Sequence, residues 1–100
     1  MELAANHALR LAWLGRAHAL AGNPDVGRRR GLKALETARR RGERGHEAYA
    51  LQLLGDLAVL GPAPDLEMAT EYYRAGLTLA ETLGMRPLAS ALSTSLPSPR

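Results

Sequence analysis

The sequence predicts an all-α protein in which antiparallel helix hairpins stack side by side, and three observations lead to this prediction. Leucine and alanine dominate the apolar residues, isoleucine and phenylalanine are absent, and valine occurs only at Val26 and Val59. Because strands favour β-branched and aromatic side chains, this bias favours helices. Glycine and proline divide the chain into segments of helical length, and the apolar residues within the segments recur at three- and four-residue steps.

The helix boundaries follow from this punctuation. Asn23-Pro24 is typical of an N-cap followed by the first helical residue, and Asp65 is a candidate cap for a later helix. Glycine tolerates the left-handed conformation that ends many helices. Candidate stops lie at Gly22, Gly42 or Gly45, Gly61 and Gly84. Pro87 suits the first turn of a further helix.

These marks predict four full helices and a fragment of a fifth. The expected ranges are 4–21, 24–41, 46–60 and 65–83, followed by 87–96. The helix over 65–83 carries an apolar stripe made of Leu66, Ala69, Tyr73, Leu77, Ala80 and Leu83. Short connections favour antiparallel neighbours. We therefore expect one helical domain over 1–92 and a disordered tail over 97–100.

Composition excludes several classes of protein. The chain has no cysteine, so disulfides and thiolate chemistry are excluded. No apolar stretch reaches the roughly 18 residues that span a bilayer, and no signal peptide is recognisable at Met1, so we expect a cytoplasmic protein without a membrane partner. The net charge of +3 is uneven, because residues 1–50 carry ten Lys/Arg against five Asp/Glu. Such an excess can attract phosphates or acidic partners, but a solvated helix face is the favoured explanation.

No catalytic, metal or cofactor site is recognisable, so we expect no enzyme activity. His7 and His18 are eleven residues apart, which places them about 16 Å apart along a helix and excludes a shared zinc ion. His46, the third histidine, falls at a helix start. Glu67 and Glu71 are one turn apart on a surface helix without an evident pocket. Glycine-rich phosphate-binding motifs are absent.

An internal repeat organises the helices into pairs. Leu14-Gly15 recurs as Leu54-Gly55, and Gly42 recurs as Gly84 at a closely similar spacing. Glycine in the middle of a helix costs roughly 1 kcal/mol relative to alanine. A glycine at the same place in both units therefore predicts a close approach of the partner helix, with Tyr73 as the large side chain between the helices of its pair.

These residues resemble the tetratricopeptide-repeat (TPR) family. Leu54-Gly55, followed by Ala69, Tyr73, Leu77 and Pro87, is similar to a nearly complete TPR unit. The resemblance implies a short right-handed solenoid with units over 4–42 and 46–84, similar to the arrays of bacterial multidomain signalling proteins that carry cyclase or ATPase modules. Departures occur at Gly27 and Gly31, where the family prefers alanine and an aromatic residue, and at Gly76. They imply an underfilled first unit.

The resemblance also implies a partner-binding groove along the first helix of each pair. The groove residues carried over are Leu9, Ala12, Arg16 and Leu20 from the first unit, and Tyr49, Gln52, Asp56 and Val59 from the second. The implied function is a protein–protein interaction module or scaffold, a fragment of a larger bacterial regulatory protein, that binds a protein or peptide without a cofactor. Self-association through unfinished repeat ends stays open, as does the role of a structural spacer in a longer array.

A nucleic-acid-binding domain is the third alternative. Arg29, Lys33 and Arg40 share one helix face, but Glu36 lies between them and that helix has no aromatic residue on which bases could stack. We therefore do not expect nucleic-acid binding.

Overall fold

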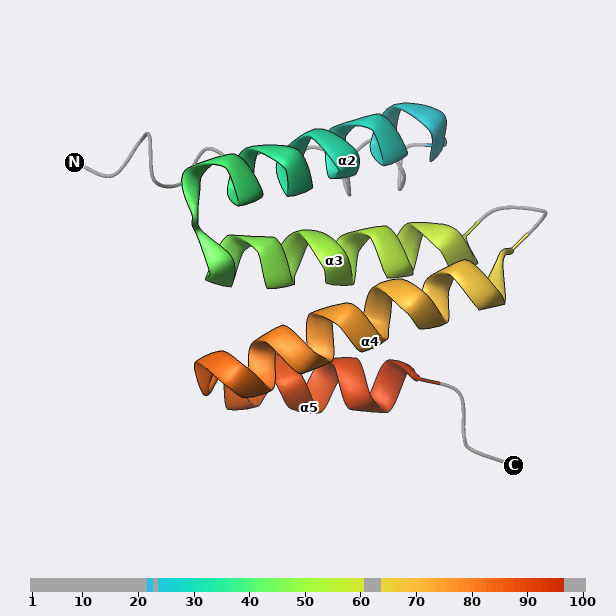
Figure 1. Cartoon of the computed structure of the whole chain (residues 1–100). Coiled ribbons are helices and arrows are strands. Elements are labelled where there is room, and N and C mark those ends of the chain that lie inside the picture. Colours follow the sequence, from blue (N-terminus) through green and yellow to red (C-terminus); the bar gives the residue numbers. More distant parts are fainter. Residues whose placement is uncertain (1–21, 23, 61–63, 97–100) are drawn as a thin grey trace.

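A computed structural model describes residues 22, 24–60 and 64–96. All regular structure in these ranges is helical, which confirms the predicted all-α class. The helices are α2 (Pro24–Arg41), α3 (Arg44–Val59), α4 (Leu66–Leu83) and α5 (Arg86–Ser95). α2, α3 and α4 lie side by side in chain order with alternating directions, and α5 packs against α4 (Figure 1). The predicted helix over 4–21 and the tail over 97–100 lie outside the described residues.

The helix ends lie close to the predicted ones. α2 spans the predicted range, and α3 begins at Arg44, two residues before the expected start. α4 begins at Leu66 because Asp65 is its N-cap, as predicted, with its Oδ1 accepting a hydrogen bond from the Met68 amide at 3.0 Å. α5 has Pro87 in its first turn, where the missing N–H costs no helical hydrogen bond.

Two helix corners in the chain have the same backbone structure. Gly42 ends α2 with φ 70°, and Gly84 ends α4 with φ 73°. The next amide in each corner reaches back into the helix: Glu43 N donates to Ala38 O at 2.9 Å, and Met85 N donates to Ala80 O at 2.8 Å. α2 and α4 are both 18 residues long. The following helices, α3 and α5, each begin at the second position after the glycine of their corner.

The core lies on both sides of α3. α3 packs against α2 on one side and against α4 on the other, and its buried residues face both neighbours. The buried cluster spans all four helices and consists of Ala34, Leu35, Ala48, Ala50, Leu51, Leu53, Leu54, Leu57, Ala69, Tyr73, Leu79, Ala80, Leu88 and Leu92. The central position of α3 therefore leaves little of its surface open to solvent.

Buried glycines mark the closest helix contacts. Gly55 lies in α3 directly beneath the ring of Tyr73 from α4, in agreement with the predicted close approach, while its expected counterpart Gly15 lies outside the described residues. A β-carbon at Gly76 of α4 would meet Leu51 of α3 and Leu92 of α5, each at 3.3 Å. Gly76 thus allows three helices to converge at one point.

Gly31 of α2 lies against α3. A β-carbon at Gly31 would lie 2.9 Å from Cδ2 of Leu54, because the side chain of Leu54 in α3 occupies the space beside this glycine. On the side facing α3, the side chain of Leu54 therefore fills the space that a side chain at position 31 would take. The other helix of the first unit, predicted over 4–21, lies outside the described residues.

The predicted apolar stripe of α4 is buried only in its middle. Ala69, Tyr73 and Ala80 are buried, but Leu66 at the start of the helix is 64% exposed and Leu83 at its end is also exposed. The neighbouring helices do not cover these two ends. The middle of the predicted apolar stripe therefore faces the core, and its two ends are open to solvent.

Candidate functional site

Beyond its first turn, α3 exposes one narrow strip of side chains. Its residues 48, 50, 51, 53, 54, 55 and 57 are buried against neighbouring helices. Tyr49, Gln52, Asp56 and Val59 recur at three- and four-residue steps and therefore share the remaining face. Tyr49 and Val59 are exposed, and Gln52 and Asp56 between them are half-buried. We call these four residues the α3 strip.

The α3 strip consists of the four groove residues predicted for the second unit. The structure places them on one face of α3, with an exposed apolar or aromatic group at each end and polar groups in the middle. The groove residues predicted for the first unit, Leu9, Ala12, Arg16 and Leu20, lie outside the described residues. The candidate site discussed below is therefore the part formed by α3 and its neighbours.

A hydrogen bond from α4 holds the acidic residue of the strip. The hydroxyl of Tyr73 donates to Asp56 Oδ1 over 2.6 Å. The ring of Tyr73 is buried, and its position is determined by its packing over Gly55. A short hydrogen bond to a charged acceptor is stronger than one between neutral groups. The Asp56 carboxylate is therefore oriented by a fixed donor and still reaches the surface.

The environment of Tyr73 keeps its hydroxyl protonated. Burial of the side chain raises the pKa of Tyr73 well above its usual range, and the hydrogen bond and negative charge of Asp56 raise it further. The Ser95 hydroxyl of α5 lies beside the Tyr73 hydroxyl and offsets part of this rise in pKa. The Tyr73 hydroxyl thus lies between Asp56 of α3 and Ser95 of α5.

α5 carries two exposed residues at positions that correspond to those of the α3 strip. Ala91 and Thr94 occupy the same positions relative to Gly84 as Tyr49 and Gln52 occupy relative to Gly42. Both side chains are exposed. The recurrence of Gly42 as Gly84 in the sequence was the signal that could have identified them.

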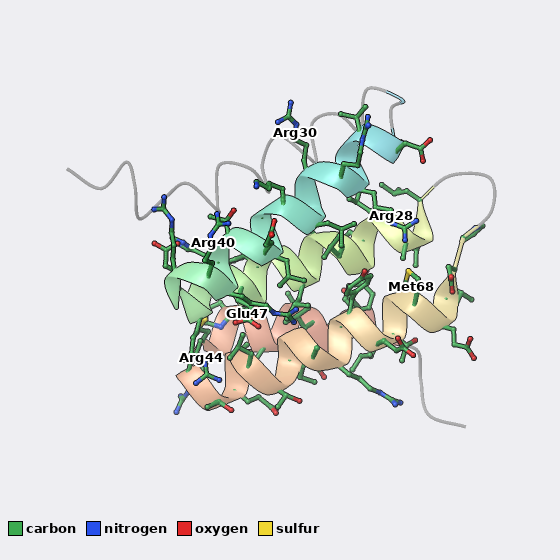
Figure 2. All side chains as sticks on the ribbon, turned by 45° about the horizontal axis from the view of Figure 1, so that its top comes forward. Arg28, Arg30, Arg40, Arg44, Glu47 and Met68 are labelled. Atoms are coloured by element: carbon green, nitrogen blue, oxygen red, sulfur yellow. The ribbon has the colours of Figure 1, made fainter. Side chains whose placement is uncertain are left out.

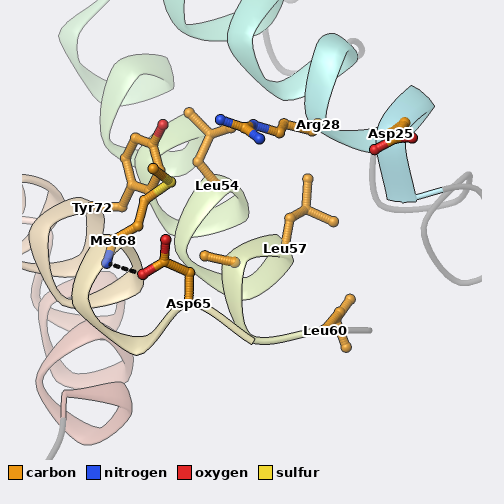
Figure 3. Close-up of a pocket in the computed structure, with 9 residues that line it drawn as sticks. Asp25, Arg28, Leu54, Leu57, Leu60, Asp65, Met68 and Tyr72 are labelled. Carbon is orange, nitrogen blue, oxygen red and sulfur yellow. Dashed lines mark hydrogen bonds between the residues drawn. The ribbon is translucent and has the colours of Figure 1, made fainter. Parts of the chain in front are cut away.

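A cavity of about 280 Å³ lies on a different side of the molecule, where α2 and α4 begin and α3 ends (Figure 3). It is lined by Asp25, Arg28, Leu54, Leu57, Ala58, Leu60, Asp65, Met68 and Tyr72. Its walls are polar and apolar in about equal parts, and its charged groups are one guanidinium and two carboxylates. Asp65 is already engaged as the N-cap of α4. Because the lining carries charges of both signs, it does not indicate whether a ligand would be positive or negative.

The basic residues of α2 do not form one patch. Arg28 and Arg30 point to different sides of the helix (Figure 2). Lys33 Nζ lies 3.7 Å from Glu36 Oε1. Arg39 Nε donates to Glu47 Oε2 at 3.0 Å. The predicted row of Arg29, Lys33 and Arg40 is exposed, but the adjacent Glu36 offsets part of its charge. The positive charge of this helix is therefore dispersed.

Other kinds of site are not recognisable in the described part of the chain. Residues 22, 24–60 and 64–96 contain no group of three or more acidic or histidine side chains placed to hold a metal ion. Over the same residues, no helix is both long and apolar enough to cross a membrane. In comparisons with known proteins, neither a family model nor a curated protein nor a solved structure matched the chain.

Proposed function

We propose that the chain is a protein-interaction module built from TPR-like helix pairs, and that it binds a peptide segment of a partner protein along the α3 strip. The observation that carries the proposal is the narrow exposed face of α3. This helix is buried on both flanks, yet it presents Tyr49 and Val59 to solvent with Gln52 and Asp56 between them. Aromatic and apolar anchors with polar groups between them are typical of peptide-binding surfaces.

The repeated corners support a TPR-like solenoid. Two glycine-capped corners with the same hydrogen bonds, one after α2 and one after α4, lie where the predicted units over 4–42 and 46–84 end, as expected if those units repeat. In a solenoid each unit contacts only its neighbours and the array presents a continuous surface. The α3 strip and Ala91 and Thr94 of α5 occupy corresponding positions of successive units, as expected for such a surface.

The alternatives differ in what they require. A structural spacer in a larger array requires neighbouring repeats to cover the α3 strip. A nucleic-acid binder requires several unpaired cations on one face, and the ion pairs of Lys33 and Arg39 reduce that number. Self-association through the repeat ends is a separate proposal. Size-exclusion chromatography with light scattering tests it, because a stable monomer at high concentration contradicts it.

Selection of peptides from a phage-displayed random library on the full chain tests the main proposal. Peptides that bind the α3 strip should lose most of their affinity for Tyr49→Ala and Val59→Ala. Leu32→Ala and Leu83→Ala are matched controls, since Leu32 is 41% and Leu83 39% exposed, compared with 40% for Tyr49 and 37% for Val59. We expect the control variants to bind as the unchanged chain does.

Two results would contradict the proposal. One is a library that yields no binder after selection on the folded chain. The other is a set of binders whose affinity is as sensitive to Leu32→Ala or Leu83→Ala as to the strip variants. Amide chemical-shift changes on peptide addition provide a check that does not depend on mutation, since they should concentrate on α3 and α5.

A further inference from the structure

The cavity where α2 and α4 begin has an apolar floor and polar groups on two sides. Leu54 and Leu57 of α3 form the floor, and both are almost fully buried. α2 contributes Arg28 to the lining, and the start of α4 contributes Asp65 and Tyr72. Figure 3 shows Arg28 at the upper side of the cavity and Asp65 at the lower side. Sites for small molecules combine apolar walls with a few polar groups that orient the ligand.

The polar groups of this lining have hydrogen-bonding positions that the described part of the chain does not use. Arg28 forms no ion pair with a described residue, although Asp25 lies three residues before it and also lines the cavity. The hydroxyl of the half-buried Tyr72 has no described hydrogen-bond partner either. Asp65 uses Oδ1 to cap α4, which leaves Oδ2. A guanidinium only donates hydrogen bonds and an ionised carboxylate only accepts them, so the two groups match ligand groups of opposite charge.

The volume of the cavity restricts the size of a ligand. The cavity measures about 280 Å³. A water molecule takes up about 30 Å³ in the liquid, so the cavity has room for on the order of nine non-hydrogen atoms. A free amino acid the size of leucine meets this limit. It also carries a negative and a positive group on one carbon atom, next to an apolar side chain.

We propose that this cavity binds a free amino acid with an apolar side chain, in its zwitterionic form. The ligand carboxylate accepts hydrogen bonds from the Arg28 guanidinium and the Tyr72 hydroxyl. The ligand ammonium group donates to Oδ2 of Asp65, and the ligand side chain packs on Leu54 and Leu57. One ligand thus uses the charges of both signs in the lining. This inference concerns a different surface from the α3 strip and goes beyond the proposed function.

Amide chemical-shift titrations of the full chain with leucine and two analogues test the inference. Isocaproate lacks the ammonium group of leucine, and isopentylamine lacks its carboxylate. Each analogue loses a charge-assisted hydrogen bond, so both should bind about tenfold more weakly than leucine. The shift changes should concentrate at the starts of α2 and α4 and at the end of α3.

Two variants assign the ligand charges to residues. Arg28→Met should abolish the preference for leucine over isopentylamine, and Asp65→Asn should abolish the preference for leucine over isocaproate. Asparagine is a good N-cap, so the second variant keeps α4 capped. Arg30→Met and Glu67→Gln are matched controls, because each removes an exposed charge close in sequence to the altered residue but outside the cavity lining. We expect both controls to bind leucine as the unchanged chain does.

Three results would overturn the inference. One is a chain whose amide shifts respond neither to leucine nor to any other apolar amino acid. Another is an analogue that binds as tightly as leucine does. The third is a control variant that weakens leucine binding as much as Arg28→Met or Asp65→Asn. Tyr49→Ala should leave leucine binding unchanged, so this inference and the proposed function can fail independently.

Discussion

A β-carbon at position 55 of α3 would lie 2.5 Å from Cε1 and 2.6 Å from Cδ1 of Tyr73 in α4. Carbon atoms that are not bonded to each other pack best at about 3.5–4.0 Å, so the ring occupies space that only glycine leaves open. The same ring carries the hydroxyl that binds Asp56. One close contact between α3 and α4 thus determines both the packing of the helices and the orientation of the acidic group in the candidate site.

We expect Gly55→Ala to destabilise the protein by about 1–3 kcal/mol. Alanine favours the helix by roughly 1 kcal/mol, but the methyl group overlaps a rigid ring that cannot shift without moving α4. The free energy of unfolding in urea measures the effect. Gly45→Ala is the matched control in the same helix, because its β-carbon would meet only Met85 atoms at 3.9 Å. A Gly55→Ala protein as stable as the Gly45→Ala protein would contradict the proposed contact.

We expect Tyr73→Phe to lower the free energy of unfolding by about 1 kcal/mol at neutral pH, because Asp56 loses a buried donor while the ring contacts remain. Urea unfolding of both proteins measures this difference. Tyr49→Phe removes a hydroxyl from an exposed position and serves as the control. An unchanged free energy of unfolding for Tyr73→Phe would show that the Asp56 hydrogen bond contributes nothing measurable.

The raised pKa of Tyr73 predicts a loss of stability in alkaline solution. In the unfolded chain a tyrosine loses its proton near pH 10, whereas the folded protein keeps Tyr73 protonated to higher pH. The folded state therefore binds more protons above about pH 10, and the free energy of unfolding should fall there by up to about 1.4 kcal/mol per pH unit. This contribution is fully present below about pH 10.

Unfolding measured between about pH 9 and 11 tests this dependence, and the Tyr73→Phe protein should lose stability less steeply than the unchanged protein over that window. Tyrosinate absorbance gives a second measurement, since one of the tyrosines should ionise only as the protein unfolds. Identical slopes for the two proteins would count against a protonated, buried Tyr73.

We expect Gly42→Ala and Gly84→Ala to destabilise the protein by similar amounts, about 1 kcal/mol each. Both glycines have positive φ, and a β-carbon at either position would meet no atom within 4 Å. The cost therefore arises from the backbone alone and should be the same in both corners. Asparagine tolerates this conformation better, so Gly84→Asn should restore part of the loss. Strongly unequal effects of the two alanine variants would argue against equivalent corners.

We expect Asp65→Ala to destabilise the protein by about 1 kcal/mol, because the Met68 amide at the start of α4 loses its acceptor. Asp65→Ser retains a capping oxygen and is the matched control. Thermal unfolding compares the two, and amide exchange should be faster in the first turn of α4 only in the alanine variant. If serine and alanine have the same effect, capping is not the role of Asp65.

The order of the helices and most of their ends could be predicted from the sequence, because caps and stops are local. A proline can begin a helix, and a glycine can end one, whatever the rest of the chain does. The contact between Gly55 and Tyr73 could also be predicted, because a glycine in the middle of a helix needs a packing reason. The exposure of Leu66 could not be predicted from apolar spacing, since periodicity does not show where a neighbouring helix ends.

From the sequence alone it followed that the described part of the chain is helical, where most of its helices begin and end, and which residues of α3 share one face. The packing of the helices was needed to show that Leu54 occupies the space beside Gly31 and that the Tyr73 hydroxyl binds Asp56. These two kinds of feature differ in how far apart along the chain the interacting groups lie. Caps depend on backbone groups within a few residues, whereas the Tyr73–Asp56 bond joins residues 17 apart on different helices and depends on how those helices rotate as they pack.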